Sequence, residues 1–198
     1  MASGEVKMKS FGSQTWLPCL TVLIGTYGVD DNKPNLTTAA WVGISSSKPS
    51  SISVSFQTPR AAFANINAKK AYTICVPSDA VAADYCGMVT GKDPSVDKFA
   101  KLGWKPVKAE KVDAPYPVEC PMVFEMRLIE THNLGLHTEF VGEIVDVKVR
   151  EDCLDEKGRP DCRKCSPIFF FMPTVEYFHL GDSAGQAFNI GKSIKDAK

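Results

Sequence analysis

The segment NLTTAAWVGISSSKPSSISVSFQTPRAAF occupies residues 35–63 and changes character along its length. Its first part, LTTAAWVGISS, is rich in β-branched residues and carries few charges, which is typical of a strand. Its middle part, SISVSF, has the two-residue period of a strand with one buried face. That period puts apolar side chains on one face and hydroxyls on the other: Ile52, Val54 and Phe56 against Ser51, Ser53 and Ser55.

The end of the segment predicts a helix that begins directly after the strand. Thr58 is placed to cap it, Pro59 suits its first position, and RAAFANINAKK follows with apolar residues at helical spacing. A helix N-terminus presents unpaired backbone N–H groups and a partial positive charge, to which Arg60 would add a guanidinium. The triplet therefore predicts either a phosphate site or an ordinary capped helix with a solvated arginine.

Trp41 precedes the alternating strand and follows four small or hydroxyl-bearing residues. Small residues beside an indole allow a flat ring to approach the backbone and to accept its N–H donors. A flat ring with a phosphate tail describes FMN, so the tryptophan and the arginine together favour a flavin site. The alternative is that Trp41 belongs to the core, where most strand tryptophans are largely buried. The residues that precede Trp41 are Thr37, Thr38, Ala39 and Ala40.

Strand patterns recur on both sides of this segment. CLTVLIGTYG at 19–28 and AYTICVP at 71–77 are apolar, and MVFEMRLIET at 122–131 resumes the pattern. In TEFVGEIVDVKVR, at 138–150, valines alternate with charged residues, which indicates an antiparallel sheet with one solvated face. The alternating residues are Val145, Val147 and Val149 against Asp146, Lys148 and Arg150.

Two further short helices are predicted between the strands. Ser78 or Asp79 can cap the first, through AVAADYCGM, and the second surrounds SVDKFAKL. Asp93 as cap and Pro94 as first residue mark the start of the second helix, and Gly103 marks its end. Short strands with a few interposed helices predict a mainly β fold, a small barrel that carries helical insertions.

Composition limits the kinds of partner. With 198 residues, 44% of them hydrophobic, the chain can fill one core, and we expect a single domain over 1–198. The net charge is zero and no lysine or arginine run occurs, which argues against nucleic-acid or membrane-surface binding and favours a small molecule. The first residues lack the apolar core of a signal peptide, and no apolar run approaches the ~18 residues of a membrane span, so we expect a cytoplasmic protein.

Seven cysteines are many for this length, but their odd number and a reducing compartment predict free thiols rather than a disulfide framework. Cys153, Cys162 and Cys165 cluster in the polar insert EDCLDEKGRPDCRKC, and the last two form a C-x-x-C. One such pair with one distant cysteine is a weak metal pattern. A metal site, a redox-active dithiol and a surface loop with free thiols all remain open for this insert.

The stretch from Asn35 to Ser78 resembles the flavin reductase-like, FMN-binding split-barrel family, and specifically its flavoredoxin-type members. The likeness consists of an asparagine, a threonine, two small residues and a tryptophan in order, then a V-S strand and an arginine-bearing helix start. It continues in DYCGMVTGKDPSVDKFAKLG, VECPMVFEMRLIE, HTEFVGEIVDV and YFHLGDSAGQAFNIGK, and covers about Trp16 to Lys192.

The resemblance implies a homodimer of Greek-key antiparallel split β-barrels with FMN bound non-covalently near the subunit interface. It implies hydride transfer from NADH or NADPH to FMN, followed by electron transfer to free flavin or to a redox partner protein. The alternative is an electron-transfer flavoprotein of flavoredoxin type with little NAD(P)H activity. The implied FMN residues are Asn35, Thr37, Thr38, Ala39, Ala40 and Trp41 at the isoalloxazine, Ser55, Phe56 and Gln57 at the ribityl chain, Thr58 and Arg60 at the phosphate, and Lys92 at the phosphate or ring edge.

Two further points concern this implied site. Pro59 and Ala62 stand where family members often carry hydroxyl residues, so two donors to the phosphate would be missing. His137 matches a histidine that family members carry at the start of the same strand. It would lie beside the flavin and act on the nicotinamide or flavin edge, or it would be a hydrogen-bonded structural histidine.

Overall fold

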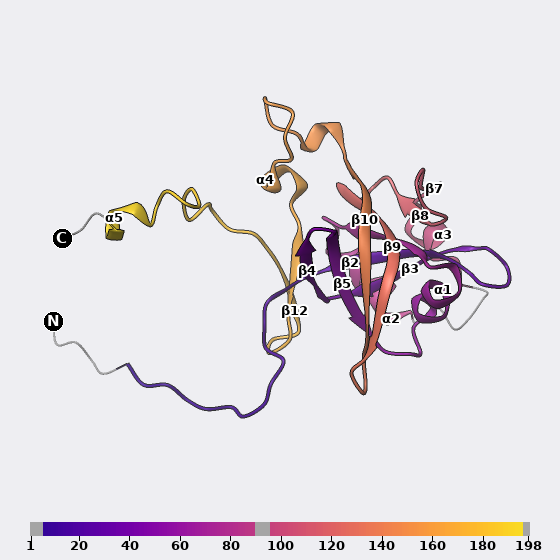
Figure 1. Cartoon of the computed structure of the whole chain (residues 1–198), viewed down its shortest axis with the longest axis horizontal. Helices are drawn as coiled ribbons and strands as arrows, with labels where there is room; N and C mark the ends of the chain where they lie inside the picture. Colours follow the sequence, from indigo (N-terminus) through magenta and orange to yellow (C-terminus); the bar gives the residue numbers. More distant parts are fainter. Residues whose placement is uncertain (1–5, 90–95, 196–198) are drawn as a thin grey trace.

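The computed structural model describes residues 6–89 and 96–195, and its centre is a seven-stranded sheet (Figure 1). Every pairing between neighbouring strands is antiparallel, as the alternating pattern predicted. In their order across the sheet, the strands are β3 (Pro34–Ala39), β2 (Val22–Tyr27), β6 (Ala71–Val76), β9 (Met122–Asn133), β10 (Thr138–Val149), β5 (Ser50–Phe56) and β4 (Trp41–Ser47).

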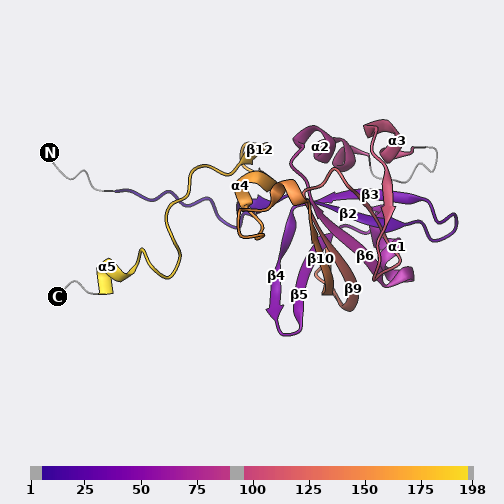
Figure 2. The ribbon, with the colours of Figure 1, turned by 90° about the horizontal axis from the view of Figure 1, so that it is seen from above.

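The two edge strands identify this sheet as a barrel that is split along one seam. β3 and β4 lie at opposite edges of the sheet, yet only Ala40 separates them in the chain. Because this connection is only two peptide steps of about 3.8 Å, the sheet has to curve until its edges approach each other. The strand order and this closure confirm the predicted mainly β, small-barrel fold, whose curvature is visible in Figure 2.

Helix α1 (Ala61–Lys69) carries the chain from β5 back to β6 beside β2, which is a Greek-key return. The predicted start of this helix at Thr58 and Pro59 is wrong. Residues 57–60 form a turn, closed by the Arg60 N–H that donates to the Gln57 carbonyl at 3.1 Å. Because this turn consumes the residues expected to open the helix, Arg60 becomes the N-cap.

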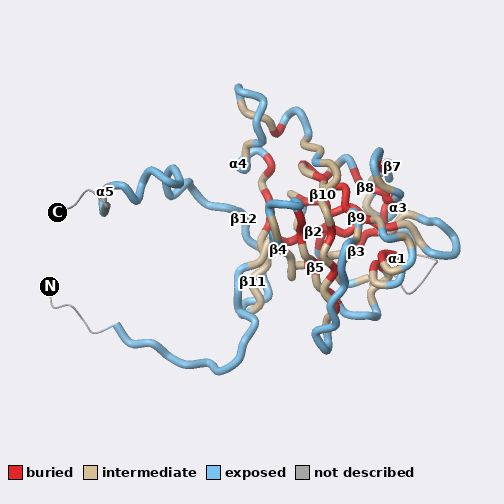
Figure 3. Tube along the Cα trace, in the orientation of Figure 1, coloured by how far each residue is buried: buried red, intermediate tan, exposed pale blue. Residues whose placement is uncertain are grey.

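The core has two layers. One cluster, which includes Val22, Ile24 and Phe140, fills the barrel; the other, which includes Leu23, lies between the barrel wall and the helices that cover it. Strand β2 is therefore buried on both faces, and its sequence shows no polar alternation for that reason. Figure 3 shows the buried residues concentrated in the barrel and its helical cover.

Two helices form this cover. α2 (Ala80–Met88) begins at Asp79, which accepts a backbone N–H three residues on, as predicted. α3 (Lys98–Leu102) ends at Gly103 in the left-handed conformation, also as predicted, but it begins after Asp97. The cap expected at Asp93 and Pro94 lies outside the described residues, and Asp97 takes this role because its carboxylate accepts the Ala100 N–H.

The sequence pattern of β10 predicted that its charged side chains face solvent on one side, and this prediction is wrong for Lys148. Val147 is 45% exposed, whereas Lys148 lies 3.3 Å from the fully buried carboxylate of Glu125 on β9. The cause lies in what covers each face: Val147 still lies opposite Phe124, which packs against the barrel core, whereas the Glu125 carboxylate beside Lys148 is covered by the loop that supplies the Glu110 and Lys111 N–H groups. The carboxylates that surround Lys148 raise the pKa of its ammonium.

The remaining elements attach to the barrel at its ends. A second, three-stranded sheet packs beside it, a short hairpin covers part of it, and two short helices belong to the polar insert. These elements are β1 (Cys19–Leu20), β11 (Ile168–Phe171) and β12 (Glu176–His179) in the second sheet, β7 (Pro106–Lys108) and β8 (Pro115–Pro117) in the hairpin, and η1 (Glu151–Cys153) and α4 (Cys162–Cys165) in the insert.

Both ends of the described chain extend away from the barrel on the same side as two arms (Figures 1 and 2). The N-terminal arm comprises residues 6–18, and the C-terminal arm comprises residues 180–195 with α5 (Lys192–Lys195) near its end. The arms expose large apolar side chains, including Val6, Met8, Phe188 and Ile194. Across the described ranges, no helix has the length and apolar character needed to cross a membrane.

Candidate functional site

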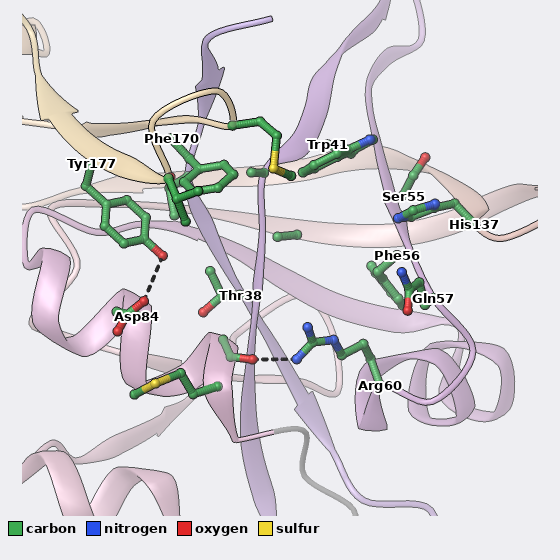
Figure 4. Close-up of a pocket in the computed structure, with 17 residues that line it drawn as sticks. Thr38, Trp41, Ser55, Phe56, Gln57, Arg60, Asp84, His137, Phe170 and Tyr177 are labelled. Carbon is green, nitrogen blue, oxygen red and sulfur yellow. Dashed lines mark hydrogen bonds between the residues drawn. The ribbon is translucent and has the colours of Figure 1, made fainter. Parts of the chain in front are cut away.

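A cavity of about 460 Å³ lies at the seam of the barrel, where β3 passes into β4 (Figure 4). Its volume is within the range of small-molecule sites. One wall comes from the seam, from β5 and from the turn before α1. The opposite wall comes from α2 and from the hairpin of β11 and β12, and it brings residues from both ends of the chain together.

Most of the residues predicted for FMN line this cavity. They are Thr38, Ala39, Ala40, Trp41, Ser55, Phe56, Gln57 and Arg60, together with His137. Within the described part of the chain, Asn35, Thr37 and Thr58 are not among the lining residues. Asn35 donates its side-chain amide to the Thr37 hydroxyl at 3.5 Å, so the two side chains interact with each other. Lys92 lies outside the described residues.

Arg60 supplies the positive charge of the site. Its side chain is half-buried, and Nη1 donates to the carbonyl of Gly87 in α2 at 2.5 Å. No side chain of the described residues caps the N-terminus of α1 with a hydrogen bond. The first N–H groups of this nine-residue helix therefore add their partial positive charge to the guanidinium, which is a favourable environment for an anion.

Trp41 is a wall of the cavity rather than a core residue. Its side chain is half-buried, and its ring stacks on that of His137 with centroids 5.8 Å apart and an angle of 8° between the planes. The small residues before it come close to α2, because the Thr38 hydroxyl donates to the Ala83 carbonyl at 2.6 Å. The seam thus presents backbone and a flat aromatic surface to the same space.

Sequence reasoning missed the opposite wall entirely. The missed lining residues are Thr21, Asp84, Gly87, Met88, Phe170, Met172, Val175 and Tyr177. Tyr177 donates its hydroxyl to Asp84 at 3.5 Å and so connects the hairpin to α2, as Figure 4 shows. The apolar run that contains Phe170 was visible in the sequence, but its place beside α2 depends on contacts across 93 residues of chain.

Thr21 tests whether the cavity suits a polar ligand. Thr21 is fully buried and lines the cavity. Its hydroxyl has no hydrogen-bond partner among the described residues. Buried hydroxyls nearly always have a partner, so a ligand with a polar edge would supply one here. A cationic end, a flat aromatic wall and an unpaired hydroxyl together fit FMN, which combines a phosphate, a polyol chain and a planar ring with polar edges.

The cysteine insert lies apart from this cavity. All seven cysteines of the chain are free thiols. Cys153 and Cys165 are buried and close to each other, Cys162 is exposed, and burial raises the pKa of Cys165 to about 11. Over 6–89 and 96–195, no group of three or more histidine, cysteine, aspartate or glutamate side chains is arranged to hold a metal ion.

The fold and the cavity together define a split β-barrel protein with a small-molecule pocket at its seam. Residues 17–171 match the family model described as flavin reductase like domain, and the chain belongs to this family. This membership confirms the resemblance found in the sequence.

Solved structures extend the likeness over nearly the whole chain. Flavoredoxin of Desulfovibrio vulgaris (Miyazaki F) is 41% identical, with a TM-score of 0.87 over 93% of this chain and 100% of its own. Flavoredoxin from Methanosarcina acetivorans is 29% identical, with a TM-score of 0.83 over 96% and 99%. A split-barrel protein from Shewanella frigidimarina NCIMB 400, 23% identical with a TM-score of 0.75 over 86% of each chain, shares the fold.

Proposed function

We propose that this chain is an FMN-binding oxidoreductase of the flavin reductase-like type. In this function, a hydride from NADH or NADPH reduces FMN, and the electrons pass to free flavin or to a redox partner protein. The observation that carries the proposal is the joint presence, in one cavity, of Arg60 at an uncapped helix N-terminus and of a flat aromatic wall at Trp41. This arrangement matches a planar ring with a phosphate tail.

The residues of the chain bind and orient the cofactor in this proposal. Arg60 and the N–H groups of α1 hold the phosphate, while Thr38, Ala39 and Ala40 allow the ring to approach the backbone. Thr21 gives its unpaired hydroxyl to a polar edge of the ligand. FMN itself supplies the redox chemistry, because its ring accepts a hydride and releases electrons to an acceptor.

His137 is a positioning residue in this proposal. Its ring stacks on Trp41 at the rim of the cavity, and the carbonyl of His137 accepts the Leu134 N–H at 2.9 Å. The stack keeps the indole flat against the space where the ring would lie. No proton transfer by a side chain is needed for a hydride to move between two rings.

A second candidate is an electron carrier that retains FMN and exchanges electrons with other proteins, with little activity toward NAD(P)H. The likeness to two flavoredoxins, at 41% and 29% identity, favours this candidate. The two functions share the same cavity and the same cofactor. They differ in whether a nicotinamide nucleotide reduces the bound flavin.

We also infer that the chain is a homodimer. The two arms expose large apolar side chains on one side of the barrel, and a second copy is the partner that would bury them. The hairpin of β11 and β12, which forms part of the cavity wall, lies on the side of the barrel from which the arms extend (Figure 1). A site near the subunit interface is consistent with this placement.

The test is an anaerobic absorbance spectrum of the purified protein, recorded before and after adding NADH and then NADPH. Flavin bands that bleach with either nucleotide are expected for the reductase. Flavin bands that persist, but bleach with a reduced ferredoxin-like protein, would favour the carrier instead. Absence of flavin bands after incubation with FMN and removal of the excess would overturn the proposed site.

A further inference from the structure

Lys98 is a buried lysine that the proposed function does not use. It is the first residue of α3 and only 1% exposed, and its Nζ donates to the carbonyls of Leu36 at 2.5 Å and of Cys86 at 3.3 Å. None of the ion pairs formed by the described residues includes Lys98. An ammonium buried against neutral carbonyls is costly, so a nearby anion would compensate it.

Among the described residues, the groups around Lys98 do not neutralise it. Within 6–89 and 96–195, the charged or titratable side chains that face it from packed elements are Arg60, before α1, and Cys86, on α2, while β3 contributes a backbone carbonyl. Burial is the main reason that the pKa of Lys98 falls to about 8, and the positive charge of Arg60 lowers it further. Burial also raises the pKa of the Cys86 thiol to about 11, so Cys86 stays neutral near physiological pH.

Lys98 and Arg60 converge on the same turn of α2. Lys98 donates to the carbonyl of Cys86, and Arg60 donates to the carbonyl of the next residue, Gly87. Carbonyls in the last turn of a helix carry partial negative charge and attract cations. Gly87 and Arg60 line the cavity, whereas Lys98 lies behind them in the core. The cavity wall at the last turn of α2 therefore has two positive charges, one exposed to a ligand and one beneath it.

We propose that Lys98 is a positioning residue for a phosphate-bearing ligand: it fixes the turn of α2 that orients Arg60 and places a second positive charge beneath the bound phosphate. The inference rests on the proposed function, in which that ligand is FMN. It also accounts for how the site holds a phosphate when Pro59 and Ala62 replace hydroxyl donors. The buried ammonium and the bound dianion stabilise each other.

The inference makes FMN affinity depend on pH. Binding of a dianion raises the pKa of Lys98, so FMN binds best when Lys98 is protonated and loses affinity as pH rises above about 8. Each unit by which binding raises the pKa corresponds to about a tenfold loss of affinity across the titration. The second ionisation of a phosphate, near pH 6, is complete in this range, and arginine does not titrate there.

The experiment measures the dissociation constants of FMN and of riboflavin from the apoprotein between pH 7 and 9.5, by quenching of flavin fluorescence. Riboflavin has the same ring and ribityl chain but no phosphate, so it reports any titration that does not involve the phosphate. We expect FMN affinity to fall about tenfold over this range and riboflavin affinity to stay constant. A Lys98→Met variant should bind FMN about tenfold more weakly at pH 7 and lose the pH dependence.

Lys101→Met is the matched control, because Lys101 is an exposed lysine on the same helix. It should keep both the affinity and the pH profile of the parent chain. If the parent binds neither flavin, the proposed function fails. If the parent binds FMN but its affinity does not change with pH, or if Lys98→Met keeps the parent's preference for FMN over riboflavin, the role of Lys98 alone is refuted. The pH dependence of FMN affinity in the parent chain tests the role of Lys98 even if Lys98→Met does not fold.

Discussion

At the scale of single residues, the backbone and the side chain of Arg60 have different roles, and the sequence pattern did not distinguish them. Its backbone ends the turn after β5, and its guanidinium is held by α2 at the edge of the cavity. A hydrogen bond to one carbonyl leaves the other guanidinium donors available, and arginine stays charged at all physiological pH values. The residue is therefore prepared for a phosphate without needing to move far.

Arg60→Ala should weaken FMN binding by about 10- to 100-fold, which corresponds to the roughly 1.5–3 kcal/mol of a hydrogen bond to a charged group. The fold should persist, because the side chain is half-buried and belongs to neither core cluster. Fluorescence titration measures the affinity. Arg163→Ala is the control, since that side chain is 79% exposed and does not line the cavity. Equal FMN affinity in both variants would remove Arg60 from the phosphate site.

At the scale of elements, β2 packs so closely against β8 that Gly25 has no room for a side chain. A Cβ added at Gly25 would collide with the Pro115 carbonyl oxygen and with the Thr73 hydroxyl, which itself donates to that carbonyl at 2.6 Å. Gly43, on the edge strand β4, has no atom within 4 Å of the same position. Two strand glycines therefore have opposite tolerance for a side chain.

Gly25→Ala should lower the free energy of unfolding by about 1–3 kcal/mol, because backbone has to shift to accept the methyl group. Gly43→Ala should leave it unchanged or raise it by up to about 1 kcal/mol, since alanine loses less backbone entropy than glycine. Urea denaturation followed by circular dichroism measures both values. A loss of stability at Gly43 equal to that at Gly25 would contradict this account of the packing.

At the scale of the whole molecule, the two arms expose large apolar side chains that nothing in the described chain covers. They extend from one side of the barrel, and Phe188 and Ile194 are almost fully exposed. Exposed apolar side chains in such number mark surfaces that associate. The barrel has its own buried core, so the arms are free to act in assembly rather than in folding.

If the proposed dimer forms through the arms, the double variant Phe188→Ser, Ile194→Ser should shift it toward monomer, because the variant removes apolar surface that the partner would bury. Sedimentation velocity at several concentrations measures this change. Gln186→Ser is the control on the same arm, since it replaces one exposed polar residue by another. A parent chain that sediments as a monomer at all concentrations would refute the dimer and assign the arms another role.

The local elements could be predicted well and the site only in part. The strand at 51–56 and the cap at Asp79 follow from side chains that are neighbours in sequence. The start of α1 was placed too early because a turn and a first helical turn favour the same residues, Thr58 and Pro59. On β10, the predicted exposure failed because the partner that draws Lys148 inward, Glu125 on β9, is distant in sequence.

Local patterns were enough to predict the strand-rich architecture, the family and the wall of the cavity at the seam, since Trp41 and Arg60 belong to one continuous stretch of residues. The rest of the site depends on how the chain folds in three dimensions. Closure of the barrel at Ala40 allows residues distant in sequence to line one cavity, so that Thr21 and Tyr177 lie with residues from the middle of the chain. The burial of Lys98 behind Arg60 likewise follows from the tertiary structure, because burial and charge depend on contacts between distant segments, which no local pattern encodes.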